Sequence, residues 1–352
     1  MTTRYLLQIQ ENYTFEILRP LQQVMREQGH SVAWLALGNK VNMALFNDDE
    51  VVLSDIAAAV SFNPAAVFVT GNVVPDFLPG LKVQLFHGFE WKKKGHFKIR
   101  GSFDLYCTQG PFFTRKFTEF AQQHGYFDVM ETGWPKLDNI FPMTEQPHLD
   151  GHDDAVHHIL YAPTFSPKLT SAAHLYDAIR ATATNQQDSQ QWHIKFHPKM
   201  AKSLITQYQD LAAEQHNITF HGAGDILPLI NKVDVLISDT SSVIAEALLL
   251  ETPVITFANA LPDPYINDIT DAHALADTLS HVLTDQAKQQ AMMQDYATEF
   301  HPYKDGHSAQ RVLAATEQVL TDGLQATKRK PSNWLRNLKL RKQNQYWPWR
   351  RA

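Results

Sequence analysis

Residues 233–251, VDVLISDTSSVIAEALLLE, decide the fold. The apolar run over 233–238 predicts a buried strand, and the spacing of apolar residues over 242–250 predicts a helix after a polar turn. Similar strand and helix patterns alternate along most of the 352 residues. This alternation is typical of βαβ units, so we expect parallel sheets covered by helices.

The predicted strands form two series that a polar segment separates. They cover residues 5–9, 31–37, 66–70, 82–86 and 104–108, and then 159–161, 192–196, 218–220, 233–238 and 253–257. The separating segment, PMTEQPHLDGHDDAVHH from Pro142, contains Pro, Gly and Asp, which indicates a linker. We therefore expect two Rossmann-like α/β domains facing a cleft. They should span residues 1–145 and 152–323, with a basic tail over 328–352.

The composition is that of a globular chain, with 44% hydrophobic and 19% charged residues. Cys107 is the single cysteine, so no disulfide framework is possible and a reducing compartment is indicated. No apolar run approaches the roughly 20 residues that span a bilayer. The N-terminal residues lack the apolar core of a signal peptide. These features predict a cytoplasmic location.

The net charge of −6 is the sum of a basic C-terminal tail and an acidic remainder of the chain, called the body here. Residues 328–351 contain nine Lys and Arg and no Asp or Glu, which leaves 22 basic against 37 acidic residues elsewhere. An acidic body argues against a nucleic-acid groove, whereas a basic tail indicates an anionic surface.

The tail also carries aromatic and aliphatic residues. Trp334, Leu335 and Leu338 have the spacing of one helical face, and Trp347 and Trp349 follow them. We therefore expect the tail to hold the chain at the anionic inner face of the cell membrane. A solvated tail or a partner-binding helix is the alternative.

Polar residues follow four of the predicted strands. Open parallel sheets bind ligands beyond the carboxyl ends of their strands. The groups are His87-Gly88 after VQLF, Pro163-Thr164 after ILYA, His197-Pro198 after WHIKF, and Asp239-Thr240-Ser241-Ser242 after VDVLIS. Because they occur in both series, we interpret them as parts of one ligand site.

His87 is the candidate general base. Gly88 allows the backbone to turn and to approach a ligand closely, and Trp91 and three lysines at 92–94 follow. Imidazole titrates near neutrality, so a histidine beside ammonium groups suits proton transfer near a phosphorylated donor. A capping histidine before a solvated lysine run is the alternative.

His197 is the candidate phosphate ligand of the second series. His193, Lys195 and His197 alternate along one predicted strand and therefore share a face. The rise of a strand puts the two histidines about 13 Å apart, which is too far for one metal ion. We expect no metal, a phosphate contact from His197 and a structural role for His193.

The DTSS turn is a second candidate phosphate site. Free backbone N–H groups at the helix start and the hydroxyls of Thr240, Ser241 and Ser242 can donate to a phosphate. Glu246, one turn further on, can accept from a ribose diol. N-capping by Ser241 or Ser242 is the alternative. Asp225 opens another helix after HGAG, which lacks the GxGxxG spacing of a dinucleotide site.

Taken in order, these motifs resemble the CDP-glycerol glycerophosphotransferase family, which builds teichoic-acid-type and related capsular polymers. The matching strings are FHG with His87, TGWPKLD from Thr132, YAPT with Pro163 and Thr164, FHP with His197, DTSS from Asp239, and DGHSAQRV from Asp305. They extend from about residue 80 to residue 315.

The resemblance implies a GT-B-like fold, with the acceptor on the side of the first domain and CDP held mainly by the second. It implies that His87 deprotonates the acceptor hydroxyl, and that His197 binds the diphosphate and helps CMP leave. The residues that would bind the CDP-polyol donor are Gly88, Pro163, Thr164, Lys195, Asp225, Asp239, Thr240, Ser241, Ser242, Glu246, Asp305 and Gly306. No cofactor is implied.

Three departures from the family pattern concern the substrates. Phe89-Glu90 stands where the family commonly has Thr-Pro, Thr240 where it has Tyr, and Glu246 where it has Asp. The polyol, glycerol or ribitol, and the acceptor, lipid-linked or glycan, therefore stay open. Two alternatives remain: a GT-B glycosyltransferase or epimerase that uses a nucleotide sugar, and a non-catalytic, membrane-docked protein that binds a polymer.

Overall fold

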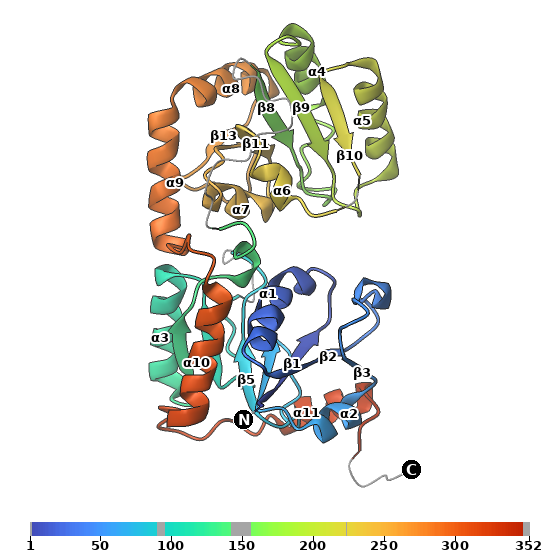
Figure 1. Cartoon of the computed structure of the whole chain (residues 1–352). Coiled ribbons are helices and arrows are strands. Elements are labelled where there is room, and N and C mark those ends of the chain that lie inside the picture. Colours follow the sequence, from blue (N-terminus) through green and yellow to red (C-terminus); the bar gives the residue numbers. More distant parts are fainter. Residues whose placement is uncertain (1, 90–95, 142–155, 223, 348–352) are drawn as a thin grey trace. The chain divides into compact units, whose positions relative to one another are not determined.

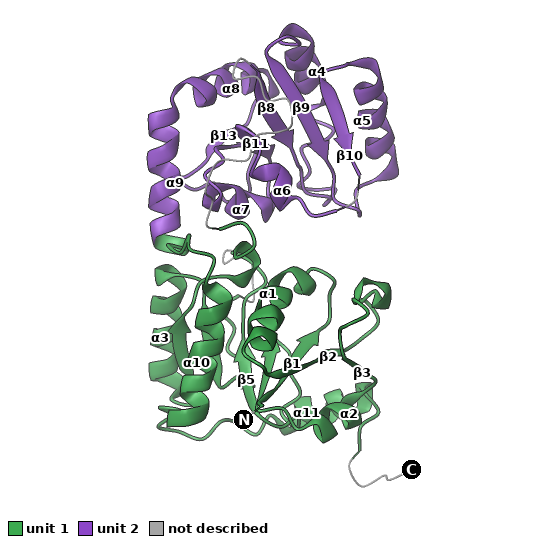
Figure 2. Cartoon of the chain, viewed as in Figure 1, with its two compact units in different colours: residues 1–143, 299–352 green, residues 144–298 purple. Residues whose placement is uncertain are grey.

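The chain forms two compact α/β units, each built on its own parallel sheet (Figure 2). The computed structural model describes residues 2–89, 96–141, 156–222 and 224–347. Unit 1 comprises residues 1–143 and 299–352, and unit 2 comprises residues 144–298. The prediction of two parallel-sheet α/β domains is confirmed. The predicted linker lies largely outside the described residues.

The sheet of unit 1 has seven parallel strands in the order β3-β2-β1-β4-β5-β6-β7. Their bounds are β1 Arg4–Ile9, β2 Ser31–Ala36, β3 Val52–Leu53, β4 Ala66–Val69, β5 Leu81–Gln84, β6 Leu105–Thr108 and β7 Asp128–Glu131. The inner strands are short and apolar because helices and loops cover both faces of the sheet, so side chains on both faces are buried.

Helices from distant parts of the sequence cover this sheet. They are α1 Thr14–Glu27, α2 Ile56–Phe62, α3 Pro111–His124, α10 Ser308–Asp322 and α11 Trp334–Gln343, with 3₁₀ turns η1 Met43–Leu45 and η2 Pro135–Leu137. α1 and α10 pack side by side (Figure 1). Leu18 and Leu21 of α1 and Val312 and Leu313 of α10 share one core cluster with Leu7 of β1.

The position of α10 corrects the expected domain boundary, because residues 299–323 belong to unit 1. Both carboxylate oxygens of Asp138 accept hydrogen bonds from the start of α10, at 3.0 Å from Ser308 N and 2.6 Å from Ala309 N. Gly306 has φ +69°, and a Cβ there would lie 2.2 Å from Phe141 O. The TGWPKLD and DGHSAQRV strings therefore meet in space and fix α10 to unit 1.

α11 and the segment before it also belong to unit 1. Lys330 Nζ lies 2.6 Å from Asp104 Oδ1, and Asn337 Nδ2 donates to Asp76 Oδ2 at 3.0 Å. The guanidinium of Arg341 lies 4.1 Å above the ring of Phe77. The described part of the tail is thus a folded element of the unit. Among the described helices, none is long and apolar enough to cross a membrane.

Unit 2 has a six-stranded parallel sheet in the order β10-β9-β8-β11-β12-β13. The strands are β8 His157–Tyr161, β9 Gln190–Lys195, β10 Ile218–His221, β11 Val235–Ser238, β12 Val254–Phe257 and β13 Asn267–Ile269. The helices are α4 Tyr176–Asn185, α5 Lys202–Glu214, α6 Leu227–Ile230, α7 Val243–Leu249, α8 Leu275–Thr284 and α9 Gln286–Phe300, with the 3₁₀ turn η3 Ala272–Ala274. Because β8 lies between β9 and β11, the chain reverses its direction of travel across the sheet beside β8, where such folds bind ligands.

Candidate active site

The three strand-end groups of unit 2 lie along one edge of its sheet. β10, β9, β8 and β11 are neighbours and run parallel, so their carboxyl ends coincide. Two contacts join the predicted groups directly. Thr164 N donates to Asp239 Oδ1 at 2.9 Å, and the Phe165 and His197 rings lie 4.4 Å apart. The structure therefore brings together the APT, HP and DTSS motifs.

Asp239 organises this edge from inside the unit. Its side chain is fully buried, and Oδ2 accepts hydrogen bonds from Ser171 N at 2.8 Å and from Ser171 Oγ at 3.0 Å. Burial raises the pKa of the carboxyl group, and these hydrogen bonds and those from Thr164 N and Thr240 N oppose the rise. That Asp239 contributes to the donor site stays a prediction; in the structure its carboxylate holds the loop that carries Thr164.

The DTSS turn keeps two hydroxyl groups at its surface. Thr240 Oγ1 accepts from Ala260 N at 3.0 Å. Ser242 is the residue before α7, yet its side chain makes no capping hydrogen bond. The alternative of N-capping is therefore wrong for Ser242. Glu246 is half-buried within α7.

His197 presents one nitrogen to solvent. Nδ1 accepts from Lys199 N at 3.0 Å, so the proton of the neutral ring sits on Nε2. Partial burial, with the nearby Lys199 ammonium as a smaller cause, lowers the pKa of the ring. A neutral imidazole with an exposed Nε2–H is a hydrogen-bond donor, which suits a phosphate oxygen.

Lys195 and Asp225 hold the loop after β10. Lys195 Nζ donates to Gly222 O at 2.7 Å, and Asp225 Oδ1 accepts from Leu227 N at 3.2 Å. Burial lowers the pKa of Lys195, while the charge of Asp225 raises it. Both side chains therefore have local partners and remain at the edge of the sheet where His197 lies.

A row of histidines crosses three strands diagonally, from the start of β8 to the end of β10. His158 Nδ1 lies 3.1 Å from His193 Nε2, and His193 Nδ1 lies 3.0 Å from His221 Nε2. Burial, with His221 and His158 as smaller causes, lowers the pKa of His193 to about 3. His221 was not among the predicted site residues, although it ends a strand just as His87 and His197 follow theirs.

In unit 1, His87 is exposed three residues beyond the end of β5. Its ring lies 5.8 Å from the ring of Tyr13, in the loop between β1 and α1. Gly88 has no left-handed backbone, and among the described residues a Cβ there would meet nothing within 4 Å. Its carbonyl accepts from Gln109 Nε2 at 2.9 Å. Trp91 and the lysines at 92–94 lie outside the described residues.

Three residues that were predicted to bind the donor, Pro163, Asp305 and Gly306, are buried or belong to the other unit. Pro163 is buried. Asp305 and Gly306 belong to unit 1 rather than to the predicted CDP-binding domain. Asp305 forms an ion pair with Arg311, which lowers the pKa of the carboxyl group. The Asp305-Gly306 motif contributes to the attachment of α10 to unit 1.

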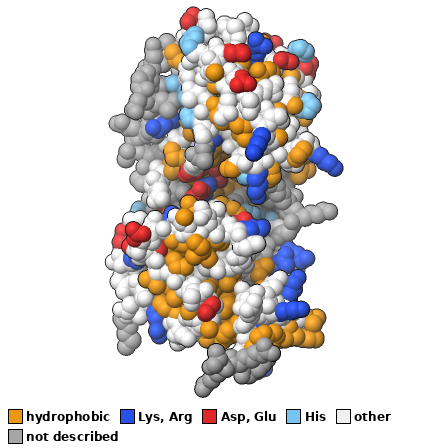
Figure 3. All heavy atoms as spheres, turned by 90° about the vertical axis from the view of Figure 1, so that its right-hand side faces the viewer, with side chains coloured by type: hydrophobic (Ala, Val, Ile, Leu, Met, Phe, Trp, Pro, Cys, Tyr) orange, Lys and Arg blue, Asp and Glu red, His pale blue; other side chains and the backbone are white. Residues whose placement is uncertain are grey.

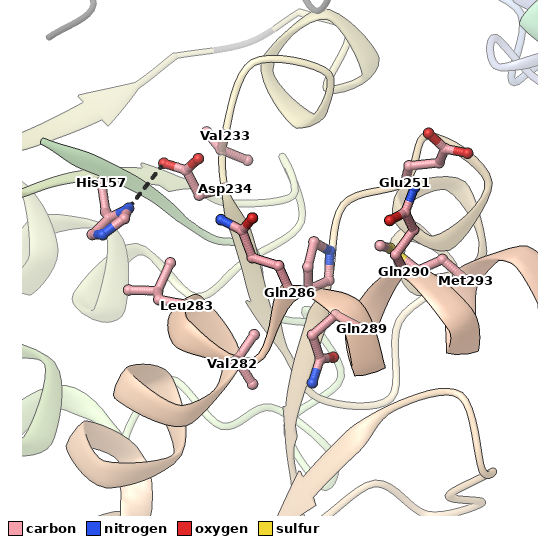
Figure 4. A pocket seen from close by; sticks show the side chains of 11 residues that line it. His157, Val233, Asp234, Glu251, Val282, Leu283, Gln286, Gln289, Gln290 and Met293 are labelled. Atoms are coloured by element: carbon pink, nitrogen blue, oxygen red, sulfur yellow. Dashed lines mark ion pairs between the residues drawn. The ribbon is translucent and has the colours of Figure 1, made fainter. Parts of the chain in front are cut away.

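A separate pocket of about 220 Å³ lies at the opposite edge of the unit 2 sheet (Figure 4). It lies where β8 begins, next to the residues that precede β11 and β12, and His157 Nδ1 lies 3.8 Å from Asp234 Oδ2 on its wall. It therefore shares no residue with the strand-end motifs. Among the residues described, no group of three or more His, Cys, Asp or Glu side chains could hold a metal ion.

Comparisons with known proteins give one family and one fold. The sequence profile of the family described as CDP-Glycerol:Poly(glycerophosphate) glycerophosphotransferase matches residues 91–318. No curated protein matches the chain. A putative UDP-N-acetylglucosamine 2-epimerase from Listeria monocytogenes is 13% identical, with a TM-score of 0.68 over 94% of this chain and 99% of that one. A variant of the wall teichoic acid polymerase TagF is 14% identical, with a TM-score of 0.65 over 91% and 89%. A UDP co-structure of S. aureus MnaA is 12% identical, with a TM-score of 0.62 over 94% and 100%.

These identities are low, so the solved structures show the GT-B fold alone, which epimerases and transferases share. The family profile distinguishes between an epimerase and a transferase for this chain. It covers more than half of the chain and includes His197 and the DTSS and DGHSAQRV strings, although it begins just after His87. The epimerase and the non-catalytic alternatives are set aside by this match. The chain therefore belongs to the CDP-glycerol:poly(glycerophosphate) glycerophosphotransferase family and is a transferase.

Proposed function

We propose that the chain transfers glycerol phosphate from CDP-glycerol to a hydroxyl group of a cell-surface polymer or glycan and releases CMP. The acceptor oxygen attacks the phosphorus that carries glycerol, and a new P–O bond forms. The bond from that phosphorus to the bridging oxygen breaks, and CMP leaves with the electron pair. The observation that carries the proposal is the family match across the strand-end motifs of unit 2.

Donor binding is assigned to unit 2. The exposed Nε2–H of His197 suits a diphosphate oxygen, and the hydroxyls of Ser241 and of Ser242, whose side chain does not cap α7, can add hydrogen bonds. Hydrogen bonds to charged groups are stronger than neutral ones. Asp239 supports these groups through the loop at Thr164.

His87 is assigned as the general base. Its imidazole is exposed beyond a strand end, where it can accept the proton that the acceptor hydroxyl loses. Proton transfer by a positioned side chain contributes about 10²- to 10⁴-fold to the rate. Tyr13 packs beside the ring and limits its orientation.

Single substitutions test these roles. We expect His87→Ala and His197→Ala each to lower CMP release from CDP-glycerol by at least about 100-fold, with unchanged thermal unfolding. His216→Ala is the matched control, since His216 is exposed and precedes β10 at the other edge of the sheet. Near-normal CMP release from either active-site variant removes that residue from the mechanism.

The donor is tested by offering CDP-glycerol, CDP-ribitol and UDP-sugars to the same preparation. We expect CMP from CDP-glycerol, and a comparable rate with CDP-ribitol would widen the polyol class. UDP release without CMP from either CDP-polyol would replace the proposal with a nucleotide-sugar reaction.

We further propose that α11 holds the enzyme at an anionic membrane surface that carries the acceptor. Trp334, Leu335 and Leu338 are 62%, 66% and 43% exposed, which is unusual for large apolar side chains grouped on one helix. Hydrophobic and cationic side chains both reach the surface on one face of unit 1 (Figure 3). Each exposed base near an anionic membrane contributes about 1 kcal/mol.

Because α11 packs on unit 1, removing the tail would also disturb the fold. We therefore expect a triple variant, Trp334→Ser, Leu335→Ser and Leu338→Ser, to lose co-sedimentation with anionic liposomes. The control triple variant replaces other exposed apolar residues of unit 1 with serine, at Met43, Leu45 and Val51. Equal co-sedimentation of the two variants would refute the role of α11.

A further inference from the structure

An open groove of about 1030 Å³ lies beside α11 in unit 1. Gln10 and Glu11, which follow β1, form one part of its lining, and residues 37–40, which follow β2, form another. The third part is the side of α11 that includes Lys339 and Gln343. The groove is therefore at the carboxyl edge of the sheet, where parallel sheets bind ligands.

The lining carries an excess of positive charge. Lys40, Arg100, Arg336 and Lys339 line the groove, against the single carboxylate of Glu11. Lys40 Nζ lies 2.5 Å from Glu11 Oε1, so that pair is neutral as a whole. Arg100 Nε is buried without a hydrogen-bond partner among the described residues, and Lys339 is exposed. Arg336 donates to Arg100 O, so Lys339 is the exposed cationic group that the groove offers to an anion.

The rest of the lining suits a chain of hydroxyl and methylene groups. Gln10, Asn39, Gln343 and Asn344 supply amide donors and acceptors, and Leu340 supplies an apolar wall. A polyol phosphate chain has hydroxyl groups that can bond to these amides and methylene groups that can pack on Leu340, whereas an inorganic anion has no methylene groups to pack there.

The groove is connected to the proposed base by one short loop. The residues between β1 and α1 include Gln10 and Glu11, which line the groove, and Tyr13, whose ring lies 5.8 Å from the ring of His87. A ligand that lies in the groove and passes along this loop reaches His87.

We propose that this groove binds the phosphate-bearing polyol chain of the acceptor and leads its terminal hydroxyl to His87. The inference rests on the proposed function, because it assumes that His87 takes the acceptor proton. It assigns α11 a second role, as one wall of the acceptor site.

The test measures binding of a fluorescent, lipid-free oligomer of glycerol phosphate by anisotropy, without CDP-glycerol. Lys339→Glu reverses a charge inside the groove, and Lys342→Glu reverses one on the same helix that does not line it. We expect roughly five- to tenfold weaker binding for Lys339→Glu and a change of less than about twofold for Lys342→Glu. Lys40→Gln, on a different wall, should weaken binding in the same direction.

Equal weakening by Lys339→Glu and Lys342→Glu would mean that α11 attracts anions through its overall charge rather than at a specific site. That result would overturn the proposal. No binding by the unaltered chain, or unchanged binding in Lys339→Glu, would overturn it as well. Liposomes of anionic lipid serve as a competitor: displacement of the oligomer from the groove by lipid headgroups would assign the groove to the membrane instead. CMP release is measured separately. Oligomer binding without CMP release would support the assignment of the groove and refute the proposed function.

Discussion

Acidification should destabilise unit 2 through the buried histidine row. His193 is almost fully buried between His158 on β8 and His221 on β10, and its pKa in the folded chain is lowered to about 3. In the unfolded chain a histidine titrates near 6.5. The unfolded chain therefore binds the proton first as the pH falls, so stability decreases from about pH 6.5 down to the folded pKa.

The size of the effect follows from the two pKa values. Between pH 7 and pH 5 the unfolded imidazole becomes almost fully protonated while the folded one stays neutral. This difference lowers the free energy of unfolding by about 2 kcal/mol. His221 has a lowered pKa from burial and from the charge of Lys195, so it acts in the same direction.

The assay is urea unfolding at pH 7 and pH 5, followed by hydrogen–deuterium exchange of peptides that cover β8, β9 and β10. His193→Gln keeps a polar side chain of similar length and removes the titration. We expect the variant to lose about 2 kcal/mol less than the unaltered chain over this pH interval. The reasoning is refuted if both proteins show the same pH dependence, whatever their stability at pH 7.

Two further predictions concern the fold that supports the site. Asp239→Asn places an amide N–H₂ against the backbone donors of Thr164 and Ser171. We therefore expect a loss of about 2–4 kcal/mol in unfolding free energy and a raised KM for CDP-glycerol. An unchanged KM would show that the Thr164 loop does not contribute to donor binding. Gly306→Ala should destabilise unit 1 by more than about 2 kcal/mol, since the residue has φ +69° and the new methyl group would meet Phe141 O. Gly88→Ala, where the methyl group meets nothing, should leave the melting temperature unchanged, and equal melting temperatures for the two variants would contradict the structural account of Gly306.

The sheets were largely predictable because their central strands are short apolar runs. Residues 192–196 were predicted as a strand and β9 spans Gln190–Lys195, and residues 104–108 were predicted as a strand where β6 spans Leu105–Thr108. The edge strands β3, β7 and β13 were missed. Edge strands of two to four residues carry too few apolar positions to stand out from a loop.

Contacts between distant residues account for what the sequence did not reveal. The capping of α10 by Asp138 joins residues about 170 positions apart, so the pattern of α10 alone gave no sign of its unit. The histidine row depends on the order of β8, β9 and β10 in the sheet, which local periodicity does not encode. The strand-end motifs were predicted because each consists of a few consecutive residues whose side chains suggest the chemistry.

The return of the chain to unit 1 has a consequence for its synthesis on the ribosome. All residues of unit 2 emerge before α10, so unit 2 can complete its fold first. Until residues 308–322 leave the exit tunnel, the core cluster that includes Leu7 of β1 lacks Val312 and Leu313. The core of unit 1 is therefore incomplete until α10 has been synthesised, and this is the stage at which a chaperone would be most needed.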